Sequence, residues 1–257
     1  MLRLIGVKKT FNPGTVNEKR ALNGVDLILN EGDFVTVIGG NGAGKSTTLN
    51  AIAGVWPVDE GEILIDGINV TRLPEYKRAK YLGRVFQDPM TGTAATMQIE
   101  ENMALASRRG LRRTLKSGIT GAERERYKEK LRILDLGLED RLTAKVGLLS
   151  GGQRQALTLL MATLTKPKVL LLDEHTAALD PKTAQKVLQA TDKIIARDNL
   201  TAKDAIAHGN RLIMMHEGRI IYDVSGEEKK NLQVSDLLQK FEQASGGEFA
   251  NDRMMLA

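Results

Sequence analysis

The sequence predicts an α/β fold in which a mainly parallel sheet carries an antiparallel β-subdomain and an inserted helical lobe. Three observations lead to this prediction. In residues 34–53 a glycine-rich turn joins a β-branched apolar run to a helical stretch. Two apolar runs flank the dipeptide Asp66-Gly67, which is a strong signal for an antiparallel hairpin. Between residues 88 and 166 the apolar residues recur at helical spacing.

Length and composition exclude several classes of protein. A chain of 257 residues can bury one substantial core with a smaller second lobe. The lack of cysteine excludes a disulfide scaffold and a thiolate metal site. We expect no signal peptide, because the apolar start of the chain is too short and the residues beyond Val7 are too polar. No apolar run approaches the ~20 residues that cross a bilayer, so a role at a membrane would require a partner.

The net charge of +5 predicts only a weak attraction to polyanions. Basic residues gather at Arg108, Arg109, Arg112, Arg113 and Lys116. No aromatic residues alternate with them to stack on bases, so we expect a solvated face and no nucleic acid as partner. An anionic cytoplasmic leaflet is a second possible neighbour of this face.

Strand patterns begin at the N-terminus and continue to Gln87. The expected strands are 2–11, 21–30, 34–38, the hairpin 62–65 with 68–70, and 82–86. Phe11 ends the first of them. Composition alone leaves two roles open for Phe11, packing on an edge strand or stacking on adenine.

The turn after the third strand has the form of a phosphate-binding loop. It consists of Gly39, Gly40, Asn41, Gly42, Ala43, Gly44, Lys45, Ser46 and Thr47, and a helical stretch closed by Gly54 follows. A strand, a G-x-x-x-x-G-K-S turn and a helix are the context in which backbone N–H groups and a helix N-terminus bind phosphate. We therefore expect a P-loop NTPase core, with Lys45 on the β- and γ-phosphates and the Ser46 hydroxyl on Mg²⁺.

The helical lobe contains a second candidate for an anion-binding helix end. Helices are expected over 97–107, 123–136 and 153–164. The residues before the third helix are Ser150, Gly151, Gly152 and Gln153. Ser150 and Gln153 fit a capping box, which is one interpretation. The other interpretation is a close approach of an anion, because two glycines cost helix propensity but leave room for a ligand.

Two acidic residues follow the buried strand predicted over 168–172. Asp173 and Glu174 would lie at the carboxyl end of that strand, where ligands of parallel sheets bind. Asp173 is suited to hold Mg²⁺ through its water shell, and Glu174 to polarise an attacking water.

The phosphate loop, Gln87, residues 149–153, residues 169–174 and Ala178-Leu179-Asp180 together resemble the ATPase subunits of ABC transporters. The resemblance covers about residues 1–222 and implies a fold of the ABC ATPase type. It implies an ATPase domain over 1–222, with a core of 1–87 and 167–222 and a helical lobe of 88–166. Residues 223–257 would form a C-terminal helix, expected over 234–241, and a tail.

The resemblance also implies a role for each motif. Residues Gly39 to Thr47 would bind the phosphates of ATP, and Phe11 would stack on adenine. Ser46, Gln87 and Asp173 would serve Mg²⁺, whereas Glu174 would be the catalytic base, assisted by Lys45 and Gln87. The segment from Ser150 to Gln153 would contact the γ-phosphate held by a second copy, and Asp180 would lie at the dimer seam.

The partners follow from the same resemblance. Two copies would pack head to tail and bind separate transmembrane permease subunits at the cytoplasmic face of the membrane. An extracytoplasmic substrate-binding protein would deliver a solute, and the sequence is most similar to importers of amino-acid-like substrates. The alternative is a soluble, non-transport ABC protein that acts as an ATP-gated clamp on nucleic acid or ribosomes.

Two features depart from the family. His175 stands where proline is more usual. After a helix expected over 181–197, the fold requires a parallel strand that ends in a histidine, but Asn199-Leu200-Thr201 leads directly into the helix-like run 202–206. His208 and His216 fall in the wrong elements. Either the natural chain contains a strand-length piece near Thr201/Ala202 that this sequence lacks, or the strand is deleted and hydrolysis is poor.

Overall fold

The computed structural model describes residues 1–88, 90–111, 118–173, 209–232 and 234–244. The chain divides into two compact units, Met1–Pro74 with Asn199–Ala257, and Glu75–Asp198. Each unit carries part of the expected core. The domain boundaries expected from the sequence remain a prediction.

An antiparallel sheet forms most of the first unit. It contains β1 (Leu2–Phe11), β2 (Lys19–Leu29), β4 (Glu60–Ile65) and β5 (Ile68–Asn69) in the order β2-β1-β4-β5. The turn between β4 and β5 has positive φ at Asp66 and Gly67 (53° and 79°), as a two-residue hairpin requires. The predicted hairpin is therefore confirmed.

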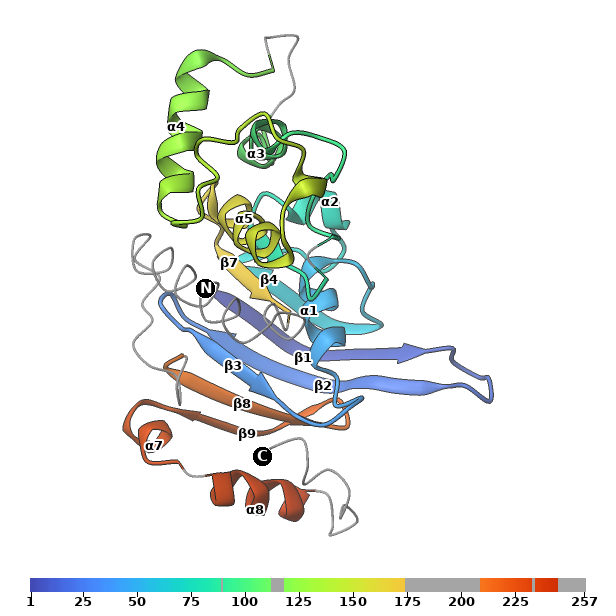
Figure 1. The fold of residues 1–257 in the computed structure, drawn as a ribbon. Coiled ribbons are helices and arrows are strands. Elements are labelled where there is room, and N and C mark those ends of the chain that lie inside the picture. The colour runs from blue at the N-terminus through green and yellow to red at the C-terminus, as the bar shows by residue number, and fades with distance from the viewer. Residues whose placement is uncertain (89, 112–117, 174–208, 233, 245–257) are drawn as a thin grey trace. The chain divides into compact units, whose positions relative to one another are not determined.

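A second sheet in the same unit positions the glycine-rich turn. Strand β3 (Val35–Ile38) pairs in parallel with β8 (Arg211–His216), which pairs antiparallel with β9 (Arg219–Ser225). Figure 1 shows β3 in blue beside β8 in orange, although they are far apart in the sequence. Helix α1 (Lys45–Ala53) follows β3 and ends at the left-handed Gly54. Helices α7 (Gly226–Lys230) and α8 (Val234–Ala244) complete the unit.

The second unit combines helices with a pair of parallel strands. Its elements are α2 (Glu75–Arg78), β6 (Leu82–Val85), α3 (Ile99–Ser107), α4 (Gly121–Arg132), a 3₁₀ turn η1 (Val146–Leu148), α5 (Gly151–Thr163) and β7 (Val169–Leu172). Strands β6 and β7 pair in parallel. Met103, Leu131 and Leu157 bring α3, α4 and α5 together in one buried cluster.

The observed helices differ from the expected ones at their ends. The helix expected over 123–136 ends at Arg132, because Asp135 and Gly137 adopt positive φ (54° and 66°). Leu134 and Leu138 are nevertheless buried, so apolar spacing predicted their burial but not the end of the helix. Helix α3 begins at Ile99 because Gln98 is its extended N-cap. The expected helix 181–197, the region around Thr201/Ala202 and the tail 246–257 lie outside the described residues.

In the part of the chain that the structure describes, the two strands that precede predicted site residues each lie at the edge of their sheet. Among the strands that the structure describes, β3 pairs only with β8 and β7 pairs only with β6. Val37 in β3 is 37% exposed, whereas parallel strands are normally buried on both faces. In the same described ranges, no helix is long and apolar enough to span a membrane.

Candidate nucleotide-binding site

Close backbone packing shapes the loop between β3 and α1. A Cβ on Gly39 would lie 2.3 Å from the Met215 carbonyl oxygen, and one on Gly44 would lie 2.8 Å from that of Ala21. Gly39 and Gly44 also have φ of +152° and +103°, which L side chains rarely adopt. The loop can therefore keep this path only with glycine at both positions.

The turn between β8 and β9 packs against the loop between β3 and α1 and is hydrogen-bonded to it. Gly218 N donates to the Ala43 carbonyl at 3.0 Å, and Asn23 N donates to the Gly218 carbonyl at 2.8 Å. Gly218 has a φ of +72°, and a Cβ there would lie 2.7 Å from the Ala21 oxygen. Sequence reasoning missed this support, because Glu217-Gly218 gives only a local turn signal.

The start of α1 fits a bound phosphate. Its N-cap, Gly44, offers no side chain to the helix, so the first-turn N–H groups remain available to an anion. Lys45 Nζ donates to the carbonyls of Gly39 (2.6 Å) and Gly40 (3.2 Å), so the ammonium lies across the loop. Ser46 is exposed on the first turn. These groups suit the phosphates of ATP.

Phe11 has neighbours that fix its ring at the end of β1. The ring meets Trp56 edge to face, with centroids 5.5 Å apart and planes at 86°. Lys9 Nζ lies 5.6 Å from the Phe11 centroid and pairs with Asp59 at 2.8 Å. This arrangement favours the packing role of Phe11, and adenine stacking remains a prediction.

In the second unit, two predicted Mg²⁺ ligands follow adjacent strands. Val85 pairs with Leu172, and Asp173 N donates to the Val85 carbonyl at 3.1 Å. Gln87 and Asp173 therefore follow the carboxyl ends of the two parallel strands, β6 and β7. Their oxygen atoms suit a hard cation such as Mg²⁺. Ser46 belongs to the other unit and Glu174 lies outside the described residues, so a shared metal site remains a prediction.

A buried amide connects helix α5 to the segment that carries Gln87. Gln155 is fully buried, and its Nε2 donates to the Phe86 carbonyl at 3.1 Å. Phe86 directly precedes Gln87, so α5 restrains the backbone of that segment. No sequence signal marked Gln155, because a buried polar residue is recognised only from its contacts.

The N-terminus of α5 has the capping box that the sequence predicts. Gln153 N donates to Ser150 Oγ at 3.3 Å, and Ser150 N donates to Gln153 Oε1 at 3.2 Å. Ser150 and Gly151 are exposed, whereas Gly152 is buried. Among the described residues the N–H groups of Gly151 and Gly152 have no hydrogen-bond partner. The capping interpretation is confirmed, and the anion-binding interpretation stays a prediction.

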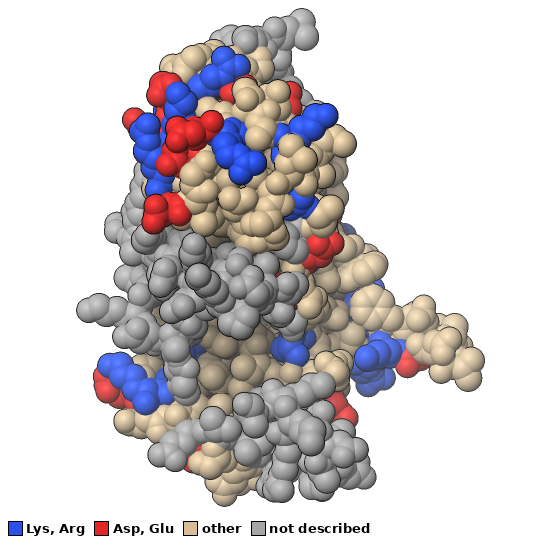
Figure 2. Space-filling view, in the orientation of Figure 1, with Lys and Arg blue, Asp and Glu red and all other residues tan. Residues whose placement is uncertain are grey.

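Two residues of the basic cluster, Arg108 and Arg109, form contacts within the second unit. Arg108 pairs with Glu123 at 2.8 Å, and Arg109 donates to the Ala162 carbonyl and to Thr165 Oγ1. Burial lowers the pKa of Arg109. Acidic and basic side chains are intermixed on the face of this unit that Figure 2 shows. Arg112, Arg113 and Lys116 lie outside the described residues.

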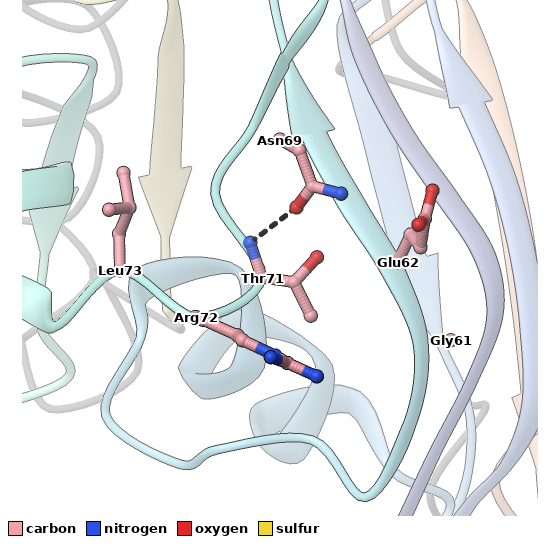
Figure 3. Close-up of a pocket in the computed structure, with 6 residues that line it drawn as sticks. All are labelled: Gly61, Glu62, Asn69, Thr71, Arg72 and Leu73. Carbon is pink, nitrogen blue, oxygen red and sulfur yellow. Dashed lines mark hydrogen bonds between the residues drawn. The ribbon is translucent and has the colours of Figure 1, made fainter.

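A pocket of about 330 Å³ lies elsewhere in the first unit. Figure 3 shows its lining residues, which are Gly61, Glu62, Asn69, Thr71, Arg72 and Leu73. Asn69 Oδ1 accepts from Thr71 N, and Thr71 Oγ1 accepts from Ile63 N, so these polar groups hold the hairpin in place. None of the predicted site residues lines this pocket.

Comparison with known proteins decides the family. The family model for ABC transporters matches residues 22–177. The chain belongs to the ATP-binding family of ABC transporters. It is 43% identical over 256 residues to a tyrosine transport ATP-binding protein of Clostridioides difficile, covering 95% of this chain and 100% of the relative. A spermidine/putrescine import ATP-binding protein of Haemophilus influenzae is 32% identical, and the match covers 89% of this chain but 59% of that relative.

Solved structures confirm the fold class. A dimeric ATP-binding cassette in a post-hydrolysis state, bound to ADP and Pi, has a TM-score of 0.72 and 31% identity. The match covers 88% of this chain and 98% of that one. The fold is thus the P-loop NTPase fold of ABC ATPases. The chain is an ATP-binding and ATP-hydrolysing subunit that powers solute transport, of the importer type, and nothing favours the clamp on nucleic acid or ribosomes.

Proposed function

We propose that two copies of this chain pack head to tail, so that each ATP lies between the phosphate loop of one copy and the Ser150–Gln153 segment of the other. The single observation that carries the proposal is the pair of exposed helix N-termini, α1 and α5, in one chain. Each end leaves backbone N–H groups available to phosphate oxygens. A similar solved structure is a dimeric cassette bound to ADP and Pi, and this supports a dimer.

Within this site we assign roles to the residues of one chain. The loop N–H groups and Lys45 hold the β- and γ-phosphates, and Glu174 accepts the proton of the attacking water. The water oxygen bonds to the γ-phosphorus as the bond to the leaving β-phosphate oxygen breaks. Mg²⁺, held through Ser46, Gln87 and Asp173, would neutralise charge on the phosphates.

Gln87 would couple this site to the transport partners. The bond from Gln155 to the Phe86 carbonyl ties the Gln87 segment to α5, so the two would shift together when ATP closes the dimer. ATP favours the closed dimer only if it binds that state more tightly, and hydrolysis removes this difference. We place the subunit at the cytoplasmic face, bound to separate permease subunits that receive solute from a substrate-binding protein.

The proposed substrate is amino-acid-like. Support comes from the relative named for tyrosine transport, which matches along its entire length, whereas the polyamine relatives extend well beyond the match. The test is the ATPase rate of the complex with its membrane partners in vesicles. Stimulation by tyrosine or a related amino acid supports this assignment, and stimulation by spermidine alone overturns it.

The strand expected near Thr201/Ala202 decides whether hydrolysis is efficient. We propose that a strand-length piece near Thr201/Ala202 is missing from this sequence, because the fold requires a parallel strand there. The intact mass tests it. A mass above 28.2 kDa by about 5–8 residues means that the strand and its histidine exist. A mass of 28.2 kDa means a true deletion, and we then expect ATP binding with weak hydrolysis.

A further inference from the structure

One cation outside the known motifs lies against the phosphate loop. Lys19 begins β2, and its Nζ is 3.1 Å from the position that a Cβ on Gly42 would occupy. Gly42 is exposed in the middle of the loop, with a φ of +79°. The same end of β2 packs against the loop, since a Cβ on Gly44 would lie 2.8 Å from the Ala21 carbonyl oxygen. The strand that supports the loop thus also delivers the ammonium group to it.

The surroundings of Lys19 differ from those of the lysines on the neighbouring strand. Lys8 pairs with Glu60 at 2.7 Å and Lys9 pairs with Asp59 at 2.8 Å. Within the described ranges, the Lys19 side chain has no hydrogen bond or ion pair, so its charge is free to meet an anion.

Strand register places Lys19 on the face that carries Phe11. The two residues are cross-strand partners, and such partners share one face of a sheet. Arg20 is opposite Thr10 and points to the other face, because successive side chains of a strand alternate. One face of the β1–β2 pair therefore carries both the Phe11 ring and the Lys19 ammonium group, and the ammonium group lies beside the loop.

We propose that Lys19 is an additional phosphate-binding residue, which contacts the α- and β-phosphates of a nucleoside di- or triphosphate seated on the loop. This inference rests on the proposed nucleotide site. Backbone N–H groups in the middle of such a loop cradle the α- and β-phosphates, so a cation beside Gly42 meets the same oxygens. Lys45 supplies charge from the helix side of the loop, and Lys19 supplies it from the strand side.

The test is isothermal titration calorimetry of ATP, ADP and adenosine with the full chain and three variants. Lys19→Gln removes the charge, Lys19→Arg keeps it, and Arg20→Gln removes the charge of a neighbouring exposed residue on the opposite face. We expect Lys19→Gln to weaken ATP and ADP binding roughly two- to fivefold, as for loss of one exposed ion pair. Adenosine binding should not change. The defect should shrink as salt is raised, because an exposed charge is screened.

Each alternative outcome has a distinct meaning. If the unaltered chain binds neither ATP nor ADP, both the nucleotide site and this inference fail. If it binds both and Lys19→Gln binds them equally well, only this inference fails. An equal defect in Arg20→Gln would also overturn it, since surface charge in general would then be the cause. Recovery of affinity in Lys19→Arg supports a direct contact, because arginine also binds phosphate oxygens.

Discussion

The N-termini of α1 and α5 are both predicted to bind phosphate, yet they are built differently. Helix α1 begins after a left-handed glycine, and no side chain caps it. Helix α5 begins after Ser150, which forms a reciprocal capping box with Gln153. The first end relies on backbone packing against β2 and the β8–β9 turn, whereas the second is stabilised by its own side chains.

The difference indicates which ligand contact each end can provide. An uncapped helix start surrounded by glycine can bring several N–H groups to one phosphate, which suits the primary binding site. A capped start has already satisfied the N–H of Gln153, so it offers only the first N–H groups and the Ser150 hydroxyl. We infer that α1 binds ATP by itself and that α5 adds its contacts when a second copy approaches.

The largest expected effect tests the role of α1. Lys45→Met should weaken ATP binding about tenfold to a hundredfold, because a charged contact to the phosphates is lost. Lys8→Met is the matched control, since it removes an exposed surface ion pair of little consequence. Calorimetric titration of both variants makes the comparison. Equal affinities would contradict the assignment of the loop.

Substitution of glycine by alanine should have opposite effects at the two ends. Gly44→Ala forces a Cβ against the Ala21 oxygen at positive φ, and we expect a loss of about 1–3 kcal/mol in the free energy of unfolding. Gly151→Ala adds helix propensity at an exposed position and should stabilise the fold by up to about 1 kcal/mol. Urea unfolding measures both. Destabilisation by Gly151→Ala would show that α5 does not begin as described.

Removal of the N-cap of α5 should distinguish the contribution of Ser150 to the stability of the fold from its contribution to dimerisation. Ser150→Ala should cost about 1 kcal/mol of stability, as other N-cap losses do. Thr120→Ala removes the equivalent cap of α4 and provides the control. We expect similar losses of stability in both variants, but weaker ATP-dependent dimerisation only in Ser150→Ala. Equal dimerisation of the two variants would argue that Ser150 is only a cap.

The smallest expected effect is a difference in acid sensitivity between the capping boxes of α4 and α5. In α4 the third residue is Glu123, and its pKa lies below the usual 4.5 because Thr120 N donates to it, with further contributions from the Thr120 hydroxyl and Arg108. Its contribution to stability is complete above the unfolded-state pKa and is lost as pH falls through the lower folded-state pKa. Gln153 in α5 does not titrate.

Thermal unfolding between pH 7 and pH 3 tests this difference. The melting temperature of Glu123→Gln should fall less between pH 7 and pH 3 than that of the unaltered chain, whereas that of Gln153→Glu should fall more. No change of the pH profile in Glu123→Gln would contradict the described cap of α4.

Local patterns predicted much of this fold, because their causes are local. The bounds of β1, the turn at Asp66-Gly67 and the cap at Ser150 follow from side-chain alternation, turn chemistry and capping. The support of the loop by Gly218, the bond from Gln155 to Phe86 and the position of Lys19 depend on contacts between distant residues. A single sequence contains no local sign of such contacts.

The short helices α2 and α7 were also missed, since four or five residues give too little periodicity to detect. Several site residues predicted from motifs, Glu174 above all, lie outside the described residues. For these residues, the sequence motif is the basis of the assignment.

The most direct test of the account is the molar mass of Glu174→Gln in solution with saturating ATP, measured by light scattering. This variant should retain bound ATP, because its catalytic base is removed. We predict a mass of twice the 28.2 kDa chain with ATP and of one chain with ADP, because only ATP would join α1 of one copy to α5 of the other. A single-chain mass at an ATP concentration that calorimetry shows to be saturating would contradict the shared site.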